Sequence, residues 1–117
     1  LFMAVEKGCD LFDCVAPTRI GRNGGAYTKD GKVNLFNQEF REDSKPIDEG
    51  CQCYSCKNFS RAYIAHLFHS KEMLAGTLTS LHNIYFITHM VKKMREEMLR
   101  GDFEKYKKEF LEEYYQK

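Results

Sequence analysis

The chain has 117 residues, of which 43% are hydrophobic and 30% are charged, and its formal net charge is +1. This length gives at most one domain with a modest core. The charge excludes a strongly basic nucleic-acid-binding protein, although not a local basic loop, and the lack of an 18-residue apolar run excludes a membrane span.

The first zone, residues 1–17, has the alternation of an α/β protein. Ala4 to Lys7 reads as the end of a helix that Gly8 stops. The short apolar run from Leu11 to Ala16 predicts a buried strand. A lone strand cannot bury itself, and the chain does not begin with Met, so we expect a piece of a longer protein whose sheet comes from elsewhere.

The second zone, residues 18–50, begins with a glycine-containing loop that carries two arginines. The following run AYTKDGKVNLF predicts a β-hairpin, because Asp30-Gly31 suits the positive φ angles of a type I′ turn. A polar stretch follows, in which a further short strand is expected around Phe40.

The third zone, residues 51–117, is expected to be helical after its cysteines. The predicted helices run from Ser60 to His69 with Asn58 or Ser60 as the cap, from Lys71 to Arg100, and from Asp102 to Tyr115. The long helix is apolar on most of its surface, which indicates burial against its own subdomain and a further surface. Its main stripe comprises Ile84, Ile87, Val91, Met94 and Met98.

The cysteines favour a metal site over disulfides. There are five, an odd number, and three of them form the pattern C-x-C-x-x-C at Cys51, Cys53 and Cys56. Such crowding fits a reduced, cytoplasmic protein better than a secreted disulfide framework. Zinc takes four thiolate or imidazole ligands in a tetrahedron, so these three thiolates need a fourth partner.

The candidates for the fourth ligand are the four histidines, because Cys9 and Cys14 lie in the predicted strand zone. Spacing alone divides the choice between His66 and His82, with His69 and His89 behind them. Four protein ligands close the coordination sphere, so the expected zinc, one per chain, is structural and its binding energy adds to the folding of a small lobe.

Two further features carry possible chemistry. Asp13 lies in the predicted apolar strand, where a carboxylate is costly unless it is paired or working, and the sequence leaves a structural and a catalytic role equally open. Asp10 is the other carboxylate of this zone, and its position fits a loop before the predicted strand better than a catalytic role. The loop TRIGRNGG suits phosphates or splayed bases of single-stranded RNA. It lacks the G-K-[ST] ending of a P-loop, and its arginines could instead pair with surface carboxylates at Glu39, Glu42 or Asp43.

Taken together, GCDLFDCVAPTRIGRNGGAYT, CQCYSC, SRAYIAHL and LHNIYF closely resemble the C-terminal part of the bacterial tRNA-guanine transglycosylases, the queuine tRNA-ribosyltransferase family. The resemblance extends over essentially the whole chain. It implies an α/β fold, the C-terminal part of a (β/α)₈ TIM barrel with a zinc-binding subdomain made of a β-hairpin and helices. Residues 1–17 would be the closing strand region, 18–50 the tRNA-recognition loop and hairpin, and 51–117 the zinc-binding helical subdomain.

The resemblance also implies residue roles. Asp13 would be the nucleophile that attacks the ribose of guanine 34 in a tRNA with a GUN anticodon, forming a covalent intermediate that 7-aminomethyl-7-deazaguanine resolves. The bases flanking guanine 34 would be recognised by Thr18, Arg19, Ile20, Gly21 and Arg22. The zinc ligands would be Cys51, Cys53, Cys56 and His82.

The same resemblance implies a cytoplasmic homodimer. It places the general acid/base aspartate and the base pocket upstream of this chain, so we expect the 117 residues alone to be inactive. The main alternative is a non-catalytic zinc-dependent module or subunit that binds RNA or a protein partner. A redox protein using C-x-x-C is weaker, because Cys51 adds a third thiol to the motif.

Overall fold

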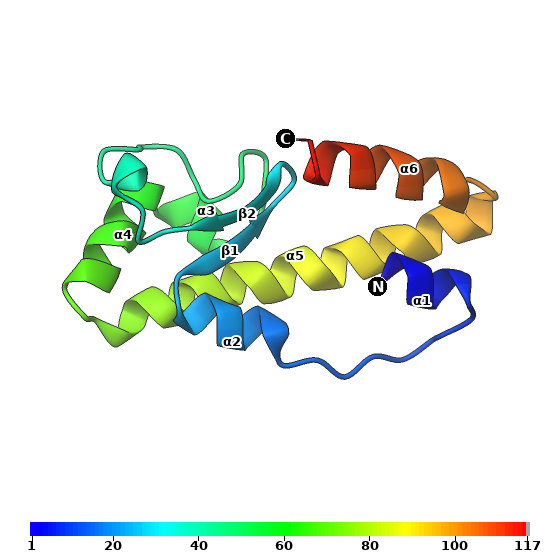
Figure 1. Cartoon of the computed structure of the whole chain (residues 1–117), viewed down its shortest axis with the longest axis horizontal. Coiled ribbons are helices and arrows are strands. Elements are labelled where there is room, and N and C mark those ends of the chain that lie inside the picture. Colours follow the sequence, from blue (N-terminus) through cyan, green and yellow to red (C-terminus); the bar gives the residue numbers. More distant parts are fainter. Residues whose placement is uncertain (117) are drawn as a thin grey trace.

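The fold is built along one long helix. The computed structural model describes residues 1–116, and its longest dimension is 46 Å. In chain order the elements are α1 (Phe2–Glu6), α2 (Ala16–Arg22), β1 (Gly25–Thr28), β2 (Gly31–Asn34), the 3₁₀-helix η1 (Gln38–Phe40), α3 (Tyr54–Asn58), α4 (Arg61–His69), α5 (Met73–Arg100) and α6 (Phe103–Tyr114). Figure 1 shows α5 as the spine, with the hairpin, α3 and α4 around its first half and α6 returning along its second half.

Helix α5 has the extent that the sequence predicts, and its end is defined by glycine. Gly101 adopts φ 82° at the C-cap, the left-handed conformation that glycine takes at little cost. The chain then reverses into α6, whose aromatic residues Tyr106 and Phe110 pack on the buried ring of Phe2 in α1. Helix α6 therefore ties α1 to the second half of the molecule.

The strand predicted from Leu11 to Ala16 is not formed. Residues 9–15 have irregular backbone, and the side chains of Leu11 and Val15 are 92% and 58% exposed. The apolar pattern is real, but a strand needs a hydrogen-bonded neighbour, and within residues 1–116 the sheet consists of the antiparallel pair β1 and β2 alone.

The arginine segment is a helix and not the predicted loop. Pro17 lies in the first turn of α2, where its fixed φ and missing N–H are tolerated. Gly21 allows the helix to approach α5, since a Cβ there would lie 2.8 Å from Ser80 Oγ and 3.1 Å from the Ser80 backbone. The glycine of this motif thus serves helix packing.

The close contact at Gly21 leads to a stability prediction. Gly21→Ala should lower the stability of the protein by about 1–3 kcal/mol relative to Gly76→Ala, because the new methyl group meets backbone that cannot move aside. Gly76 is the matched control, since its Cβ would lie 3.5 Å from Arg22, an ordinary contact. Both substitutions gain the same helix propensity. Thermal unfolding compares the two, and equal midpoints would show that α2 does not need this close approach.

The predicted hairpin is confirmed, although its turn differs. Strands β1 and β2 pair from Gly25↔Asn34 to Thr28↔Gly31. Among the described residues only Lys71 has a positive φ without being glycine, so Lys29 and Asp30 do not form a type I′ turn. Gly31 takes the positive φ, 118°, and the Thr28 hydroxyl donates to its carbonyl.

The strand expected around Phe40 is also wrong, because this segment is the 3₁₀-helix η1. Asn34 ends β2 by accepting a hydrogen bond from the Phe36 amide through its side chain, which turns the chain away from the sheet. The Phe40 ring is nevertheless buried, and the guanidinium of Arg61 lies 5.1 Å above it. The apolar residue therefore indicated a buried position, but not the backbone conformation of its segment.

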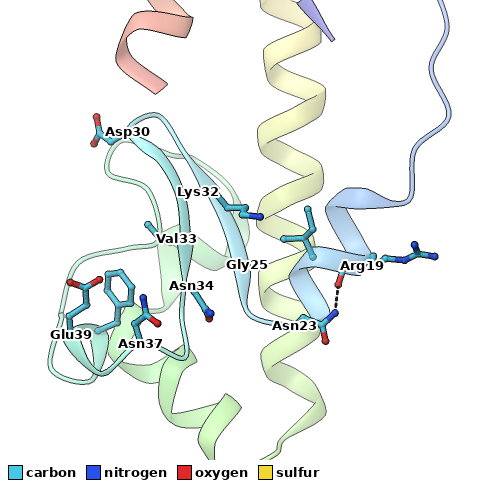
Figure 2. Close-up of a pocket in the computed structure, with 11 residues that line it drawn as sticks. Arg19, Asn23, Gly25, Asp30, Lys32, Val33, Asn34, Asn37 and Glu39 are labelled. Atoms are coloured by element: carbon cyan, nitrogen blue, oxygen red, sulfur yellow. Dashed lines mark hydrogen bonds between the residues drawn. The ribbon is translucent and has the colours of Figure 1, made fainter. Parts of the chain in front are cut away.

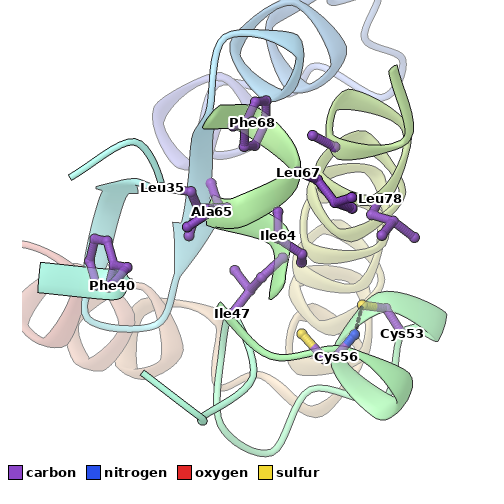
Figure 3. Packing of buried hydrophobic residues seen from close by; sticks show 12 residues of the cluster. Leu35, Phe40, Ile47, Cys53, Cys56, Ile64, Ala65, Leu67, Phe68 and Leu78 are labelled. Carbon is purple, nitrogen blue, oxygen red and sulfur yellow. Dashed lines mark hydrogen bonds between the residues drawn. The ribbon is translucent and has the colours of Figure 1, made fainter. Parts of the chain in front are cut away.

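One hydrophobic core joins the hairpin, the loop before the cysteines, α4 and the first half of α5 (Figure 3). Helix α4 begins at Ser60, whose hydroxyl accepts from the Tyr63 amide, so Ser60 is the cap. The core side chains include Leu35, Phe40, Ile47, Cys53, Cys56, Ile64, Ala65, Leu67, Phe68 and Leu78. Two of the cysteines thus lie at the margin of a packed core.

The second half of α5 is less covered than its sequence predicts. Met94 is buried, but Ile84 and Met98 of the predicted stripe are 44% and 50% exposed. A mainly apolar groove of about 550 Å³ lies beside this half and includes Leu11, Phe12 and Val91. Within residues 1–116, no helix is both long and apolar enough to cross a membrane.

Candidate metal centre and arginine helix

Three cysteines and one histidine meet in one place. Cys51 and Cys53 lie just before α3, Cys56 lies within it, and His82 comes from the middle of α5. The four ligand atoms all lie within 4.8 Å of one another. The distances from His82 Nδ1 to the three Sγ atoms are 3.6 Å for Cys51, 3.5 Å for Cys53 and 3.3 Å for Cys56.

These distances fit a tetrahedral zinc ion. With Zn–S bonds of about 2.3 Å and a Zn–N bond of about 2.0 Å, ligand sulfur and nitrogen atoms lie about 3.5 Å apart. Three cysteines and one histidine are also a donor set typical of structural zinc sites. The geometry therefore supports a buried site that can hold one metal ion, with all four positions supplied by protein.

Local hydrogen bonds shape the cysteine segment. The Cys53 side chain caps α3 by accepting from the Cys56 amide at 3.3 Å, and Cys51 Sγ lies 3.5 Å from the Cys53 amide. The buried hydroxyl of Ser55 donates to the Leu78 carbonyl at 2.6 Å. The capping turn brings the thiols together, and the Ser55 bond fixes that turn against α5.

His82 is oriented by a second hydrogen bond. Its side chain is fully buried, and Nε2 lies 2.6 Å from the carbonyl oxygen of Tyr27 in β1. A carbonyl only accepts, so Nε2 carries a proton, and Nδ1, which faces the sulfur atoms, is the nitrogen that would bind a metal ion. This arrangement, in which the second ring nitrogen donates to a backbone carbonyl, is typical of metal-binding histidines.

Among the histidines that the sequence left open, His82 is the one that lies at the cysteines. The side chains of His66, His69 and His89 are exposed. His69 lies 3.2 Å from the Phe36 carbonyl, and the His89 ring stacks on Tyr85. Ordinary local interactions thus account for two of the three other histidines.

Without a cation, the cluster must retain protons. Hydrogen bonds from Cys51 and Cys56 hold the pKa of the Cys53 thiol far below its usual value, while the same network raises the pKa of Cys56. Burial lowers the pKa of His82, but its interactions with Cys51 and Cys53 outweigh burial and raise it to about 10. A divalent cation would replace these shared protons and neutralise the thiolates.

Asp13 is exposed and lies in the irregular segment between α1 and α2. The structure does not surround it with apolar side chains, so the cost of burying a carboxylate does not arise here. The apolar strand in which the sequence placed Asp13 is not formed within residues 1–116.

The two arginines of α2 form no ion pair within the described part of the chain. Arg19 and Arg22 have exposed side chains on α2, and neither has a carboxylate partner within 4.0 Å there. Asp43 pairs with Arg61 and Lys45 instead, at 3.3 and 3.9 Å. The surface pairing that the sequence offered as an alternative for Arg19 and Arg22 is therefore not found.

The other members of the predicted recognition segment face the protein. Thr18 is half-buried and donates its hydroxyl to the Val15 carbonyl. Ile20 packs against Gly25, where a Cβ would lie 2.2 Å from Ile20 Cγ2, and Gly21 faces α5. Only Arg19 and Arg22 of the five present exposed side chains.

A groove of about 750 Å³ opens beside Arg19, between α2 and the hairpin (Figure 2). Its polar lining includes Asn23, Lys32 and Asn37 together with the carboxylates Asp30 and Glu39, and the Asn23 amide donates to the Arg19 carbonyl at 3.1 Å. Amide and amino groups of this kind can hydrogen-bond to nucleotide bases and phosphates.

Sequence reasoning missed Asn83, which follows His82 in the LHNIYF motif. Its buried side chain accepts from the Tyr27 amide at 3.1 Å and donates to the carbonyls of Pro17 at 3.0 Å and Gly25 at 2.9 Å. The available signal was an amide placed among apolar residues on an otherwise buried helix face, since such a group must find partners.

The fold and the site define a small metal-binding lobe, with a buried Cys₃His cluster and an exposed helix that carries two arginines. Comparison with known proteins identifies the family. The family model described as queuine tRNA-ribosyltransferase matches residues 1–116. A queuine tRNA-ribosyltransferase of Clostridium perfringens strain SM101 is 53% identical over 111 residues, which cover 95% of this chain and 29% of that protein. The enzyme of Clostridium botulinum strain Langeland is 50% identical over 111 residues, covering 95% of this chain and 30% of its own length. The enzyme of Caldanaerobacter subterraneus is 47% identical over 115 residues, covering 98% of this chain and 31% of its own length.

The chain therefore belongs to the queuine tRNA-ribosyltransferase family. It spans about 30% of the length of the curated relatives it matches. The resemblance inferred from the motifs is confirmed, and the mixed helix and hairpin fold with its Cys₃His cluster fits the zinc subdomain expected from that resemblance.

Proposed function

We propose that this chain is the C-terminal part of a tRNA-guanine transglycosylase, which exchanges guanine 34 of a GUN anticodon for 7-aminomethyl-7-deazaguanine. The observation that carries the proposal is the family match along the described chain together with the buried Cys₃His cluster. In the complete enzyme, residues 1–17 would supply the closing strand region of a TIM barrel, 18–50 the tRNA-recognition segment, and 51–117 the zinc-binding subdomain. The proposal includes a cytoplasmic homodimer.

Asp13 is the proposed nucleophile. Its carboxylate forms a bond to C1′ of the ribose while the glycosidic bond to guanine breaks, and guanine leaves with a proton from an acid elsewhere in the enzyme. The incoming base then bonds to C1′ through its ring nitrogen, loses its proton, and displaces the carboxylate. Within the described chain Asp13 has no hydrogen bond or ion pair that occupies its carboxylate, so the group remains available for this role.

Helix α2 is the proposed tRNA contact. Arg19 and Arg22 are exposed and have no acidic partner in the described chain, so their guanidinium groups remain available to bases and phosphates. The groove next to Arg19 adjoins this surface and carries further hydrogen-bonding side chains, among them Asn23, Lys32 and Asn37. Thr18, Ile20 and Gly21 would contribute through the shape and backbone of the helix.

The proposed zinc ion is structural. Cys51, Cys53, Cys56 and His82 would occupy all four positions, so no site remains for water or substrate. The ion supplies a cross-link between the cysteine turn and α5, and it takes no part in the bond changes at ribose.

Exchange of labelled guanine into tRNA tests the proposal. The complete, zinc-loaded enzyme is expected to incorporate guanine into a tRNA with guanine at position 34, and not into the same tRNA with adenine there. Absence of incorporation from a folded, zinc-loaded protein with its cognate tRNA would favour the non-catalytic subunit or binding module instead.

The isolated 117-residue chain is expected to show no guanine exchange, because the proposed acid/base aspartate and base pocket belong to other parts of the enzyme. The same assay applied to the isolated chain, with metal content and circular dichroism confirming that it is folded, checks this. Exchange at a rate near that of the complete enzyme would contradict the division of roles proposed here.

A further inference from the structure

Asn83 occupies a junction between three elements. It lies on α5 directly after His82, and its side chain is fully buried. Both amide protons are used, one for the Pro17 carbonyl and one for the Gly25 carbonyl, and the amide oxygen accepts from the Tyr27 backbone N–H. These bonds join α5 to Pro17 in the first turn of α2 and to Gly25 and Tyr27 in β1.

The Tyr27 peptide links Asn83 to the cysteine cluster. Asn83 holds the N–H of Tyr27 at 3.1 Å, and His82 Nε2 donates to the carbonyl of the same residue at 2.6 Å. Two adjacent side chains of α5 therefore both hydrogen-bond to the backbone of Tyr27 in β1. His82 also contacts the sulfur atoms of the cysteines, and Asn83 also bonds to α2 through Pro17.

Helix α2 needs such an anchor. It has two turns, and the segment before it, residues 9–15, is irregular and largely exposed. In its packing on α5, Gly21 faces Ser80 and Gly76 faces Arg22, and these are van der Waals contacts without a hydrogen bond. The Pro17 bond to a buried amide fixes the position of α2 along α5.

We propose that Asn83 is a positioning residue that holds α2, and with it Arg19 and Arg22, at a fixed place relative to the Cys₃His cluster. The inference rests on the proposed function in one respect, that α2 binds tRNA. The positioning of α2 does not depend on tRNA binding. It follows from the three hydrogen bonds of the buried Asn83 amide, all of which a substitution to alanine would remove at once.

Hydrogen–deuterium exchange of the complete zinc-loaded enzyme tests the positioning directly. In Asn83→Ala, amides of residues 19–23 should exchange about tenfold faster, while zinc remains at one ion per chain. The KM for tRNA should rise about tenfold while kcat changes by less than about twofold, because the displaced arginines affect binding more than bond breaking.

Two further variants sharpen the test. Asn83→Asp keeps the shape and the acceptor for the Tyr27 amide but loses the donors to the Pro17 and Gly25 carbonyls, so residues 19–23 should exchange faster while the Tyr27 amide stays protected. Thr79→Val is the control, since Thr79 is buried one turn earlier on α5 and its hydroxyl bonds only to Ala75 of its own helix. Thr79→Val should leave exchange in α2 and the KM unchanged.

The outcomes separate this inference from the proposed function. Unchanged exchange of residues 19–23 in Asn83→Asp would overturn the positioning role, whatever the enzyme's activity. Faster exchange there, in an enzyme whose tRNA binding is unaltered, would overturn the coupling of Asn83 to tRNA recognition. If the unmodified enzyme showed no guanine exchange, the proposed function would fail while the exchange result on α2 still stood.

Discussion

Replacing Asp13 by Asn in the complete enzyme is expected to lower the kcat for guanine exchange by at least about 10³-fold, the scale seen when an enzyme loses its covalent nucleophile. An amide has nearly the shape of the carboxylate but lacks its charge, so it cannot form the proposed bond to ribose C1′. The Cys₃His cluster includes no residue of this segment, so zinc content should be unchanged, and thermal unfolding of the variant checks that it is folded. Steady-state incorporation of labelled guanine measures the effect.

Asp10→Asn is the matched control for this prediction. Asp10 is an exposed carboxylate in the same irregular segment, three positions earlier, so both variants remove one negative charge from the same surface. Asp10→Asn should retain exchange within about twofold, as expected of a surface substitution. Equal loss of activity in both would point to a general charge effect, and full activity in Asp13→Asn would remove Asp13 from the mechanism.

His82→Ala is expected to weaken zinc binding by more than about 100-fold, beyond the 10- to 100-fold typical of losing a partner that only orients a ligand. The substitution removes the donor that lies 3.3–3.6 Å from the three sulfur atoms. It also leaves the Tyr27 carbonyl without its donor. Because zinc binding contributes to folding, the midpoint of thermal unfolding should fall as well.

Metal analysis after dialysis against a chelator compares His82→Ala with His66→Ala. His66 is an exposed residue of α4, and spacing alone favoured it as much as His82. His66→Ala should keep one zinc per chain. Equal zinc retention by the two variants would show that His82 is not a ligand, and loss from both would indicate a metal site arranged differently from the cluster described here.

Local signals predicted the third zone well. The helices around Ser60, Gly101 and Asp102 begin or end within a few residues of their predicted bounds, because caps and glycines act through neighbouring backbone. The cysteine pattern likewise predicted a compact cluster, since the three thiols share one turn. Which histidine joins them depends on how α5 crosses that turn, a tertiary property that spacing cannot supply.

The structure differs from the sequence predictions where the conformation depends on distant partners. The run from Leu11 to Ala16 has the composition of a buried strand, yet the described chain contains no neighbour for it to pair with. Glycine in the arginine segment was interpreted as a loop residue, whereas Gly21 lies in a helix that requires a small side chain against Ser80. Asn83 was missed because a single polar residue in a helix gives no indication of three partners on other elements.

The most direct test of the account is to trap the covalent intermediate. The complete enzyme is incubated with a GUN tRNA without an incoming base, denatured, digested with nuclease and protease, and analysed by mass spectrometry. The account predicts a ribose-linked adduct on the peptide that contains Asp13, localised to that side chain and absent from Asp13→Asn. An adduct on another residue, from an enzyme that exchanges guanine normally, would contradict it.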